Sequence, residues 1–476
     1  RHARGRADRG PVRRERDPEA LDNLGALHAA RGQPDAAALA LRAALAVDAT
    51  RADTLYNLAT VEFMVGDAAG AAAHFAAAAA ARPGFALALR GEAQARAALD
   101  ETSAALALAV QAAELADDAD ACAYAAMLHL QAEAPAEALR WATRAAALLD
   151  EAGPHSLVGA AHAALGDHAA ALAAYARAAA LAPDRLEPHF NCAVMAEALL
   201  DYPAAIAHFR RAHAVDRDHR PALVNLTRLL IDVGHDQPGE LAACLEHMLA
   251  LDPDDPMARH LLDGVRGHVS AVAPPRYIAE MFDAVADDYD AMMLDRLGYQ
   301  GPTLVTDALT ALGVARCARA LDLGCGSGLI GATLRPRVGW LGGVDLAPRM
   351  LALAEARGIY DRLDHADVVE HLRAGDDRFE LIVAGDVMIY LGDLAPVFAG
   401  VRARLAPGGL WLFTVEESTD DDVRLHPTGR YAHHRDYLAR TLAAQQLEVV
   451  RIAAGVLRHQ AGQPVDGLVV VARAPA

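Results

Sequence analysis

The chain has 476 residues, of which 54% are hydrophobic and 22% charged, so it is globular rather than disordered and long enough for two or three domains. Its formal net charge of −19 argues against nonspecific nucleic-acid binding, which needs clustered positive charge. Much of the hydrophobic share is alanine and only 5% of residues are aromatic, a composition typical of many closely packed helices.

Targeting and redox signals are weak. No apolar stretch approaches the ~20 residues of a membrane span, and the arginine-rich residues 1–17 lack the apolar core of a signal peptide. The five cysteines form no C-x-x-C pair and favour neither a disulfide framework nor a zinc site. We therefore expect a cytoplasmic protein without metal or membrane segments, in which residues 1–17 are a disordered lead-in.

Residues 18–265 repeat with a period near 34. Gly32, Gly66 and Asp100 are each 34 residues apart. After a two-residue slip in the fourth unit, Gly166, Leu200 and Gly234 continue the series at the same spacing. Five residues further stand small residues, at Ala37, Ala71, Ala105, Ala171 and Ala205, and four further still come bulky ones, at Leu41, Phe75, Tyr175 and Phe209. Each period predicts two antiparallel helices that bury their apolar face only against neighbouring pairs.

The clearest unit runs from Tyr56-Asn57-Leu58-Ala59 through Gly66-Asp67, Ala71 and Phe75 to Pro83. This pattern resembles tetratricopeptide repeats. The resemblance implies an α-solenoid of about seven units over residues 18–265, with a protein or peptide partner on its concave face. A role limited to dimer formation or to spacing domains is the alternative.

The pattern changes around a proline-containing joint, Ala273-Pro274-Pro275. We expect the second domain to comprise residues 266–476, with this joint near its start. Strand-length apolar runs alternate with helical segments and predict a parallel sheet with crossover helices. We expect seven strands, at 318–324, 340–346, 361–366, 379–385, 409–416, 447–458 and 465–473. The last two are joined by residues 461–464 alone, too few for a parallel crossover, so they should form an antiparallel hairpin.

The loop after the first of these strands carries the first motif, Leu321-Asp322-Leu323-Gly324-Cys325-Gly326-Ser327-Gly328. Its glycines permit a tight turn and a close approach to a ligand, and the following helix offers free N–H groups. Dinucleotide-binding loops are usually spaced G-x-G-x-x-G. The spacing here is G-x-G-x-G, which resembles the S-adenosylmethionine (SAM) motif of class I methyltransferases.

Four further segments match this family in order. They are Gly342-Gly343-Val344-Asp345-Leu346, His365-Ala366-Asp367-Val368, Phe379 to Asp386 with the following Val387-Met388, and Leu405-Ala406-Pro407-Gly408-Gly409. The resemblance covers residues 275–476. It implies a Rossmann-like domain that follows the helical repeats in the sequence, which is an α plus α/β architecture. The seven-stranded sheet of this domain would end in the antiparallel hairpin.

The resemblance also implies residue roles. Asp322, Gly324, Gly326 and Gly328 would hold the methionine end of SAM, Asp345 with Leu346 the ribose, and Asp367 with Val368 the adenine. Asp386 would face the methionine part and the substrate. Residues 282–290 resemble the family's F-D-x-x-A-x-x-Y-D helix, which places Tyr289 near the sulfonium. Purely structural roles are open for Asp322 as a loop cap, Asp367 as a strand-end carboxylate and Tyr289 as a packing residue.

The acceptor site is expected in the polar segment after residue 416, which is too long for a minimal turn and predicts a lid. Within it, Gly429-Arg430-Tyr431-Ala432-His433 looks like a signature of methyltransferases fused to tetratricopeptide repeats. His433 is the candidate base or acceptor-orienting residue, with Arg430 and Tyr431 beside it. His434 is the alternative start of the next helix.

Three functions are open. The first is a SAM-dependent methyltransferase acting on a small molecule or on a protein held by the repeats. The second is a scaffold whose α/β domain binds a nucleoside without catalysis. The third is an NAD-dependent oxidoreductase, which leaves the glycine spacing and the Pro-Gly-Gly turn unexplained. The fourth-strand segment Gly385-Asp386-Val387-Met388 lacks an Asn/Asp-Pro-Pro-Tyr sequence and argues against methylation of nucleic-acid bases.

Overall fold

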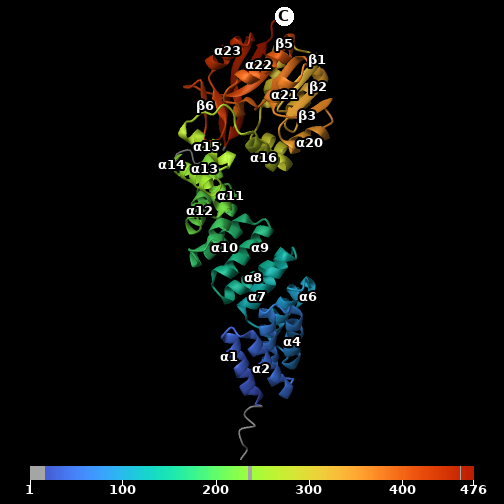
Figure 1. Cartoon of the computed structure of the whole chain (residues 1–476), viewed down its shortest axis with the longest axis vertical. Coiled ribbons are helices and arrows are strands. Elements are labelled where there is room, and N and C mark those ends of the chain that lie inside the picture. The colour runs from blue at the N-terminus through green and yellow to red at the C-terminus, as the bar shows by residue number, and fades with distance from the viewer. Residues whose placement is uncertain (1–16, 234–237, 461) are drawn as a thin grey trace, which may run out of the picture. The chain divides into compact units, whose positions relative to one another are not determined.

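The computed structural model describes residues 17–233, 238–460 and 462–476 (Figure 1). It divides into two compact units, one ending at Ala222 and the other beginning at Leu223. Residues 1–16 of the predicted lead-in and the repeat position Gly234 lie outside the described residues. The border predicted at 265/266 stays a prediction, because compactness and repeat membership are different criteria. Within the described ranges, no helix is long and apolar enough to cross a membrane.

The repeat region is built of helix pairs. The first six are α1 (Pro18–Ala30) with α2 (Pro34–Val47), α3 (Ala52–Met64) with α4 (Ala68–Ala81), α5 (Ala86–Ala97) with α6 (Thr102–Leu115), α7 (Ala119–Gln131) with α8 (Pro135–Leu148), α9 (Ala152–Ala164) with α10 (His168–Leu181), and α11 (Leu186–Ala198) with α12 (Tyr202–Val215). A seventh pair, α13 (Arg220–Val233) with α14 (Pro238–Leu251), falls largely in the second unit. The predicted array of about seven pairs is confirmed.

The repeat period reflects one backbone requirement. In each of the six pairs, the turn after the first helix contains a residue with positive φ. These residues are Gly32, Gly66, Asp100, Glu133, Gly166 and Leu200. This left-handed conformation ends a helix at low cost when the residue is glycine. Glu133 marks the turn of the fourth pair, so two consecutive units are each one residue short. The predicted two-residue slip in the fourth unit is corrected accordingly.

The small and bulky repeat positions form the core of the array. Ala37, Ala71, Ala105, Ala171 and Ala205 are completely buried. The bulky side chains lie against glycines in neighbouring helices: a Cβ added to Gly91 would come 2.6 Å from Phe75 Cε1, and one added to Gly159 would come 2.8 Å from Tyr175 Cδ1. Close helix approach therefore depends on these small residues.

The second unit continues with helices around a sheet (Figure 1). Its helices are α15 (Pro256–Arg266), α16 (Pro275–Val285), α17 (Tyr289–Ala291), α18 (Gly301–Ala311), α19 (Leu329–Leu334), α20 (Pro348–Ala356), α21 (Val368–Ala374), α22 (Ala395–Arg404) and α23 (Arg435–Ala444), with short turns η2 (Ala286–Asp288), η3 (Met292–Arg296), η4 (Arg335–Arg337) and η5 (Met388–Tyr390). Its strands are β1 (Cys317–Leu323), β2 (Val338–Asp345), β3 (Arg362–His365), β4 (Phe379–Ala384), β5 (Leu405–Glu417), β6 (Val423–Leu425), β7 (Tyr431–His433), β8 (Glu448–Gln460) and β9 (Gln463–Arg473).

The sheet follows the order β3-β2-β1-β4-β5, with β9 antiparallel to β5 and β8 antiparallel to β9. The pairs among β1 to β5 are parallel. Residues of α21, α22 and α23 share one buried cluster with the sheet, whereas α18 and α19 share another, so helices cover both faces. All seven predicted strands and the terminal hairpin are present. The predicted count is nevertheless too low, because the described sheet has nine strands.

The two additional strands, β6 and β7, lie within the predicted lid. Glu416 pairs with Gly467 of β9 on one edge of β5 and with Ala432 of β7 on the other. Strand β4 pairs with β5 only as far as Phe413, whereas β7 pairs with Glu416 and Glu417 of β5. Strand β7 therefore continues the sheet beyond the carboxyl end of β4. In open α/β sheets, ligands bind at such carboxyl ends.

Candidate functional site

The glycine loop between β1 and α19 approaches other backbone and side chains closely. Gly324, Gly326 and Gly328 all have positive φ, which disfavours other residues. A Cβ on Gly324 would lie 2.3 Å from Val387 Cγ2, whereas one on Gly326 would meet only the Tyr289 hydroxyl, at 3.8 Å. The middle of the loop therefore has room beside it, bounded by Tyr289.

Asp322 is 1% exposed at the end of β1. Its Oδ2 accepts a hydrogen bond of 2.7 Å from the Tyr360 hydroxyl. Its Oδ1 makes no hydrogen bond of normal geometry among the described residues, although the Gly331 amide lies close enough to lower the pKa of the carboxyl. Burial raises the pKa of Asp322 to about 7, and the nearby Asp345 acts in the same direction. A buried carboxylate oxygen without a donor is costly, so this atom suits a ligand that brings a donor or a positive charge.

Asp345 at the end of β2 supports the glycine loop. Its Oδ2 accepts 2.8 Å from the Gly326 amide, and its Oδ1 accepts 2.9 Å from the Ala347 amide. Burial raises its pKa, although these backbone bonds oppose the rise. Each oxygen keeps a second lone pair, so hydroxyl donors can still bind there. The neighbouring Leu346 carbonyl lies 2.9 Å from His365 Nε2.

Asp367 follows β3 and caps α21. Its Oδ1 accepts 2.9 Å from the Val369 amide and 3.1 Å from the Glu370 amide. Val368 is buried in the core cluster below the sheet. The structural role of Asp367 is therefore that of an N-cap, and its binding role stays a prediction.

Tyr289 reaches the glycine loop from α17. Two acidic residues near it attach the 275–291 segment to neighbouring elements. Asp290 accepts 2.5 Å from the Ser327 hydroxyl and is paired with Arg357. Asp283 in α16 accepts 2.9 Å from the Arg349 amide at the start of α20. The 275–291 segment is thus bound to the glycine loop at Asp290 and to α20 at Asp283.

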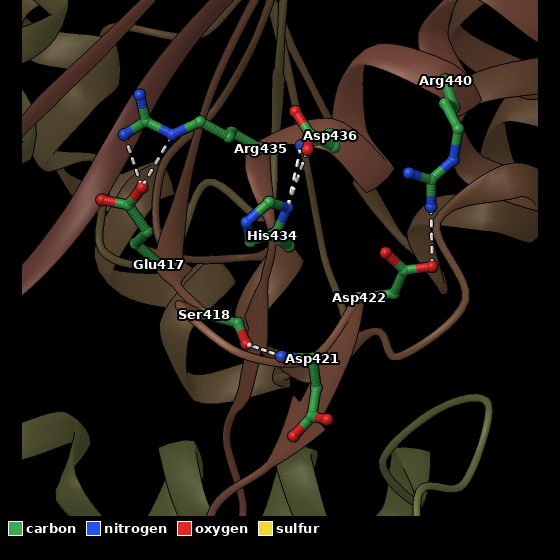
Figure 2. Close-up of polar contacts among 8 residues, drawn as sticks. All are labelled: Glu417, Ser418, Asp421, Asp422, His434, Arg435, Asp436 and Arg440. Carbon is green, nitrogen blue, oxygen red and sulfur yellow. Dashed lines mark hydrogen bonds and ion pairs between the residues drawn. The ribbon is translucent and has the colours of Figure 1, made fainter.

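The segment after β5 is ordered rather than a loose lid. Figure 2 shows Arg435 of α23 bound to Glu417, and Arg440 bound to Asp422 at 2.6 Å. The Asp421 amide donates to the Ser418 hydroxyl, and His434 Nδ1 accepts from the Asp436 amide. His434 is thus the N-cap of α23, as the alternative expectation had it.

His433 and Tyr431 lie in β7 and are completely buried. His433 Nε2 is 3.2 Å from the Gly392 carbonyl, and its ring stacks on Tyr437 at 5.8 Å. Burial lowers the pKa of His433 to about 4, so the ring is neutral at pH 7. The Tyr431 hydroxyl is 2.6 Å from Ser270 Oγ. The structure thus places both side chains in a packed layer, and their catalytic roles stay predictions.

A buried charge cluster lies at the carboxyl ends of β4 and β5. Arg458 of β8 is paired with Asp386 at 2.8 Å and with Glu416, and the three side chains are 3%, 14% and 12% exposed, respectively. Asp386 has φ of 55°, a strained value for a non-glycine residue, and its amide donates 2.9 Å to Thr414 Oγ1. Strain retained by surrounding contacts is typical of functional sites.

Arg430, immediately before β7, is half-buried beside this cluster. Its Nη1 donates 2.8 Å to Gln460 Oε1, and its side chain lies close to the Tyr390 hydroxyl. The structure therefore brings Tyr289, Asp322 and Asp345 together around the glycine loop. It brings Arg430 and Asp386 together at the buried charge cluster.

A family model described as a methyltransferase domain matches residues 321–411. The match begins in β1, crosses the glycine loop and the ends of β2, β3 and β4, and finishes in β5. This segment is similar to methyltransferase domains. It holds all five sequence motifs, in the order expected for class I.

Individual relatives match parts of the chain. Human methyltransferase-like protein 27 is 44% identical over 85 residues, which are 17% of this chain and 34% of that protein. The chain spans about a third of the length of the first curated relatives that it matches.

Two solved structures resemble different parts of the chain. The N-methyltransferase NodS from Bradyrhizobium japonicum WM9, in complex with S-adenosyl-L-homocysteine (SAH), is 19% identical, with a TM-score of 0.35 over 42% of this chain and 98% of that chain. YrrB, a tetratricopeptide protein with an unusual peptide-binding site, is 20% identical, with a TM-score of 0.36 over 40% of this chain and 98% of that chain.

Four residues of the methyltransferase domain's site were missed by sequence reasoning: Tyr360, Arg357, Glu416 and Arg458. Tyr360 and Arg357 precede the third strand in a stretch without a motif. The partners Arg458 and Asp386 are 72 residues apart, and a single sequence offers no signal for that pairing. Glu416 does open the segment suspected as the acceptor site, but its partner was not predictable.

Proposed function

We propose that the domain transfers a methyl group from SAM to a small-molecule or protein acceptor. The observation that carries the proposal is the buried carboxylate of Asp322, whose Oδ1 makes no hydrogen bond of normal geometry among the described residues, two residues before a glycine loop that has open space at Gly326. A carboxylate there suits the cationic amino group of a methionine moiety. The matching family model supports the reaction class, and the acceptor is not identified by it.

In this proposal, Asp345 binds the ribose hydroxyls with Leu346 beside it, and Asp367 with Val368 faces the adenine. Bound SAM supplies a methyl group on a sulfonium, and its carbon–sulfur bond breaks as the acceptor's lone pair forms the new bond. Tyr289 borders the loop and excludes water from its open side. Positioning of this kind supplies much of the rate in a bimolecular transfer.

The same proposal divides the acceptor side into two layers. Arg430 and Asp386 face the acceptor, whereas His433 and Tyr431 support them from the packed layer of β7. A histidine of pKa about 4 is a weak base at pH 7, so we infer that His433 orients the Gly392 segment instead of removing a proton.

Asp345 provides the direct test of cofactor binding. Asp345→Ala should weaken binding of both SAM and SAH by about 1–3 kcal/mol, because the loop amides and the ribose hydroxyls lose their acceptor. Isothermal calorimetry on the full chain measures this loss, and Asp364→Ala is the matched control, because Asp364 is a half-buried strand carboxylate that pairs with Arg362 and His371. Undiminished SAM affinity in Asp345→Ala would remove this residue from the site, and tighter binding of NAD than of SAM would favour the oxidoreductase.

The scaffold alternative keeps cofactor binding and lacks turnover. Labelled methyl transfer from SAM into an extract of the native host separates the two, because a scaffold leaves every fraction unlabelled. The intact set of Asp322, Asp345 and Asp367 favours the enzyme.

The repeats are proposed to recruit the acceptor or a partner protein. Such arrays present an extended concave surface that a small cofactor does not need. A chain that begins at Leu223 should keep SAM affinity and lose methylation of protein acceptors, chiefly through weaker acceptor binding. Calorimetry and labelling of the protein fraction measure both, with circular dichroism to verify folding. A folded truncated chain that fails to bind SAM would contradict this division of roles.

A further inference from the structure

Arg430 has only neutral hydrogen-bond partners. The side-chain oxygen of Gln460 accepts a hydrogen bond of 2.8 Å from Nη1, and the Tyr390 hydroxyl lies close to the guanidinium. In the parts of the chain that the structure describes, no carboxylate forms an ion pair with Arg430. A guanidinium has five N–H donors, so Gln460 leaves donors of Arg430 available for a ligand.

The carboxylates nearest to this region are already bound. Asp386 and Glu416 are both paired with Arg458. His426, which lies near Arg430 and Glu416, has its pKa lowered by burial and is neutral at pH 7. A ligand anion is therefore the natural partner for the donors of Arg430.

The position of Arg430 relative to the glycine loop is set by a row of aromatic rings. The Phe282 ring contacts Tyr289 at 6.0 Å and Tyr390 at 5.8 Å, both edge to face. Tyr289 borders Gly326, and Tyr390 lies close to Arg430. A flat acceptor lying along these rings would reach from the loop to the guanidinium.

Arg430 is also held in place by its neighbours in sequence. His260 Nε2 of α15 is 2.9 Å from the Gly429 carbonyl, and the buried Tyr431 hydroxyl is bound to Ser270. The backbone on both sides of Arg430 is thus fixed, which lowers the entropy lost when its side chain binds a ligand.

We propose that Arg430 binds a carboxylate of the methyl acceptor, and that this acceptor is a small organic acid whose apolar body lies against Phe282 and Tyr390. The inference rests on the proposed methyltransferase function. A guanidinium binds a carboxylate through two parallel hydrogen bonds. A carboxylate fits better than a phosphate, because the Arg458 cluster already has one negative charge in excess and a phosphate carries about two.

The test uses the full chain loaded with SAH and a panel of acetate, succinate and benzoate, with benzamide as the neutral isostere of benzoate. Calorimetry should show binding of at least one acid, with benzoate bound at least tenfold more tightly than benzamide. Arg430→Gln should lower that affinity at least tenfold without changing SAH affinity. Arg451→Gln, at an exposed arginine of the same sheet, is the matched control and should change neither affinity.

Several outcomes would overturn the inference. They are equal binding of benzoate and benzamide, unchanged affinity in Arg430→Gln, tighter binding of inorganic phosphate than of any acid, and no acid binding while SAH binds. Thermal unfolding of Arg430→Gln and Arg430→Lys verifies that both fold, and the lysine variant should recover only part of the affinity because it lacks the planar fork. Failure of SAH itself to bind the wild-type chain would instead refute the proposed function, and this inference with it.

Discussion

Arg458→Ala should destabilise the methyltransferase domain by about 3–5 kcal/mol, the usual cost of leaving buried charges without their partner. Arg458 is 3% exposed and is the shared partner of Asp386 and Glu416, which are themselves nearly buried. Its loss leaves two like charges at the carboxyl ends of β4 and β5, and the strained backbone at Asp386 loses one of its supports.

The measurement needs a probe confined to one unit, because the chain unfolds in at least two parts. Trp340 and Trp411 lie in the methyltransferase domain, whereas Trp141 lies in the repeats. Urea unfolding followed by tryptophan fluorescence in a Trp141→Phe background therefore reports the domain alone.

Arg440→Ala is the matched control for Arg458. The Arg440 pair with Asp422 is 59% exposed on each side, so its loss should cost no more than about 1 kcal/mol. Combining Arg458→Met with Asp386→Asn and Glu416→Gln should recover much of the stability, because no buried charge is then left unpaired. A loss below about 1 kcal/mol for Arg458→Ala alone would show that the cluster is solvated or rearranges easily.

The parts of the fold that the sequence predicted are those with a local physical cause. The period near 34 is visible because each pair needs a residue with positive φ, and glycine fills three of six such positions. The seven strands are visible because their apolar runs are buried between two layers of helices. Strands β6 and β7 were missed because three residues are too few to show an alternating pattern.

The site was predictable on the cofactor side and much less on the acceptor side. Asp322 and Asp345 stand in motifs at strand ends, where topology dictates what surrounds them. His433 stands in a polar segment that suggested an exposed lid, yet pairing of β7 with β5 buries it. The pairing of Arg458 with Asp386 and Glu416 is purely tertiary, so only a structure reveals it.

The second large effect concerns pH and Asp322. Burial raises the pKa of its carboxyl to about 7 in the folded chain, against about 3.9 when unfolded. Between these values the folded chain holds a proton that the unfolded chain has released. Stability that is present below about pH 4 should therefore fall as pH rises to 7, by at most about 4 kcal/mol for this group.

Asp322→Asn isolates this contribution, because asparagine keeps the shape and does not titrate. Without cofactor, the unfolding free energy of the wild type should fall relative to that of Asp322→Asn as the pH rises from 5 to 8. A second measurement concerns the proton on Asp322. If Asp322 binds a cationic amino group as proposed, SAH should bind the ionised carboxylate, so that Asp322 releases its proton on binding near pH 6.

Calorimetry in two buffers of different ionisation enthalpy detects that release, which Asp322→Asn should abolish. A pH-independent difference between the two proteins would mean that Asp322 is ionised in the free protein, and the unpartnered Oδ1 would then be stabilised by solvent instead of awaiting a ligand.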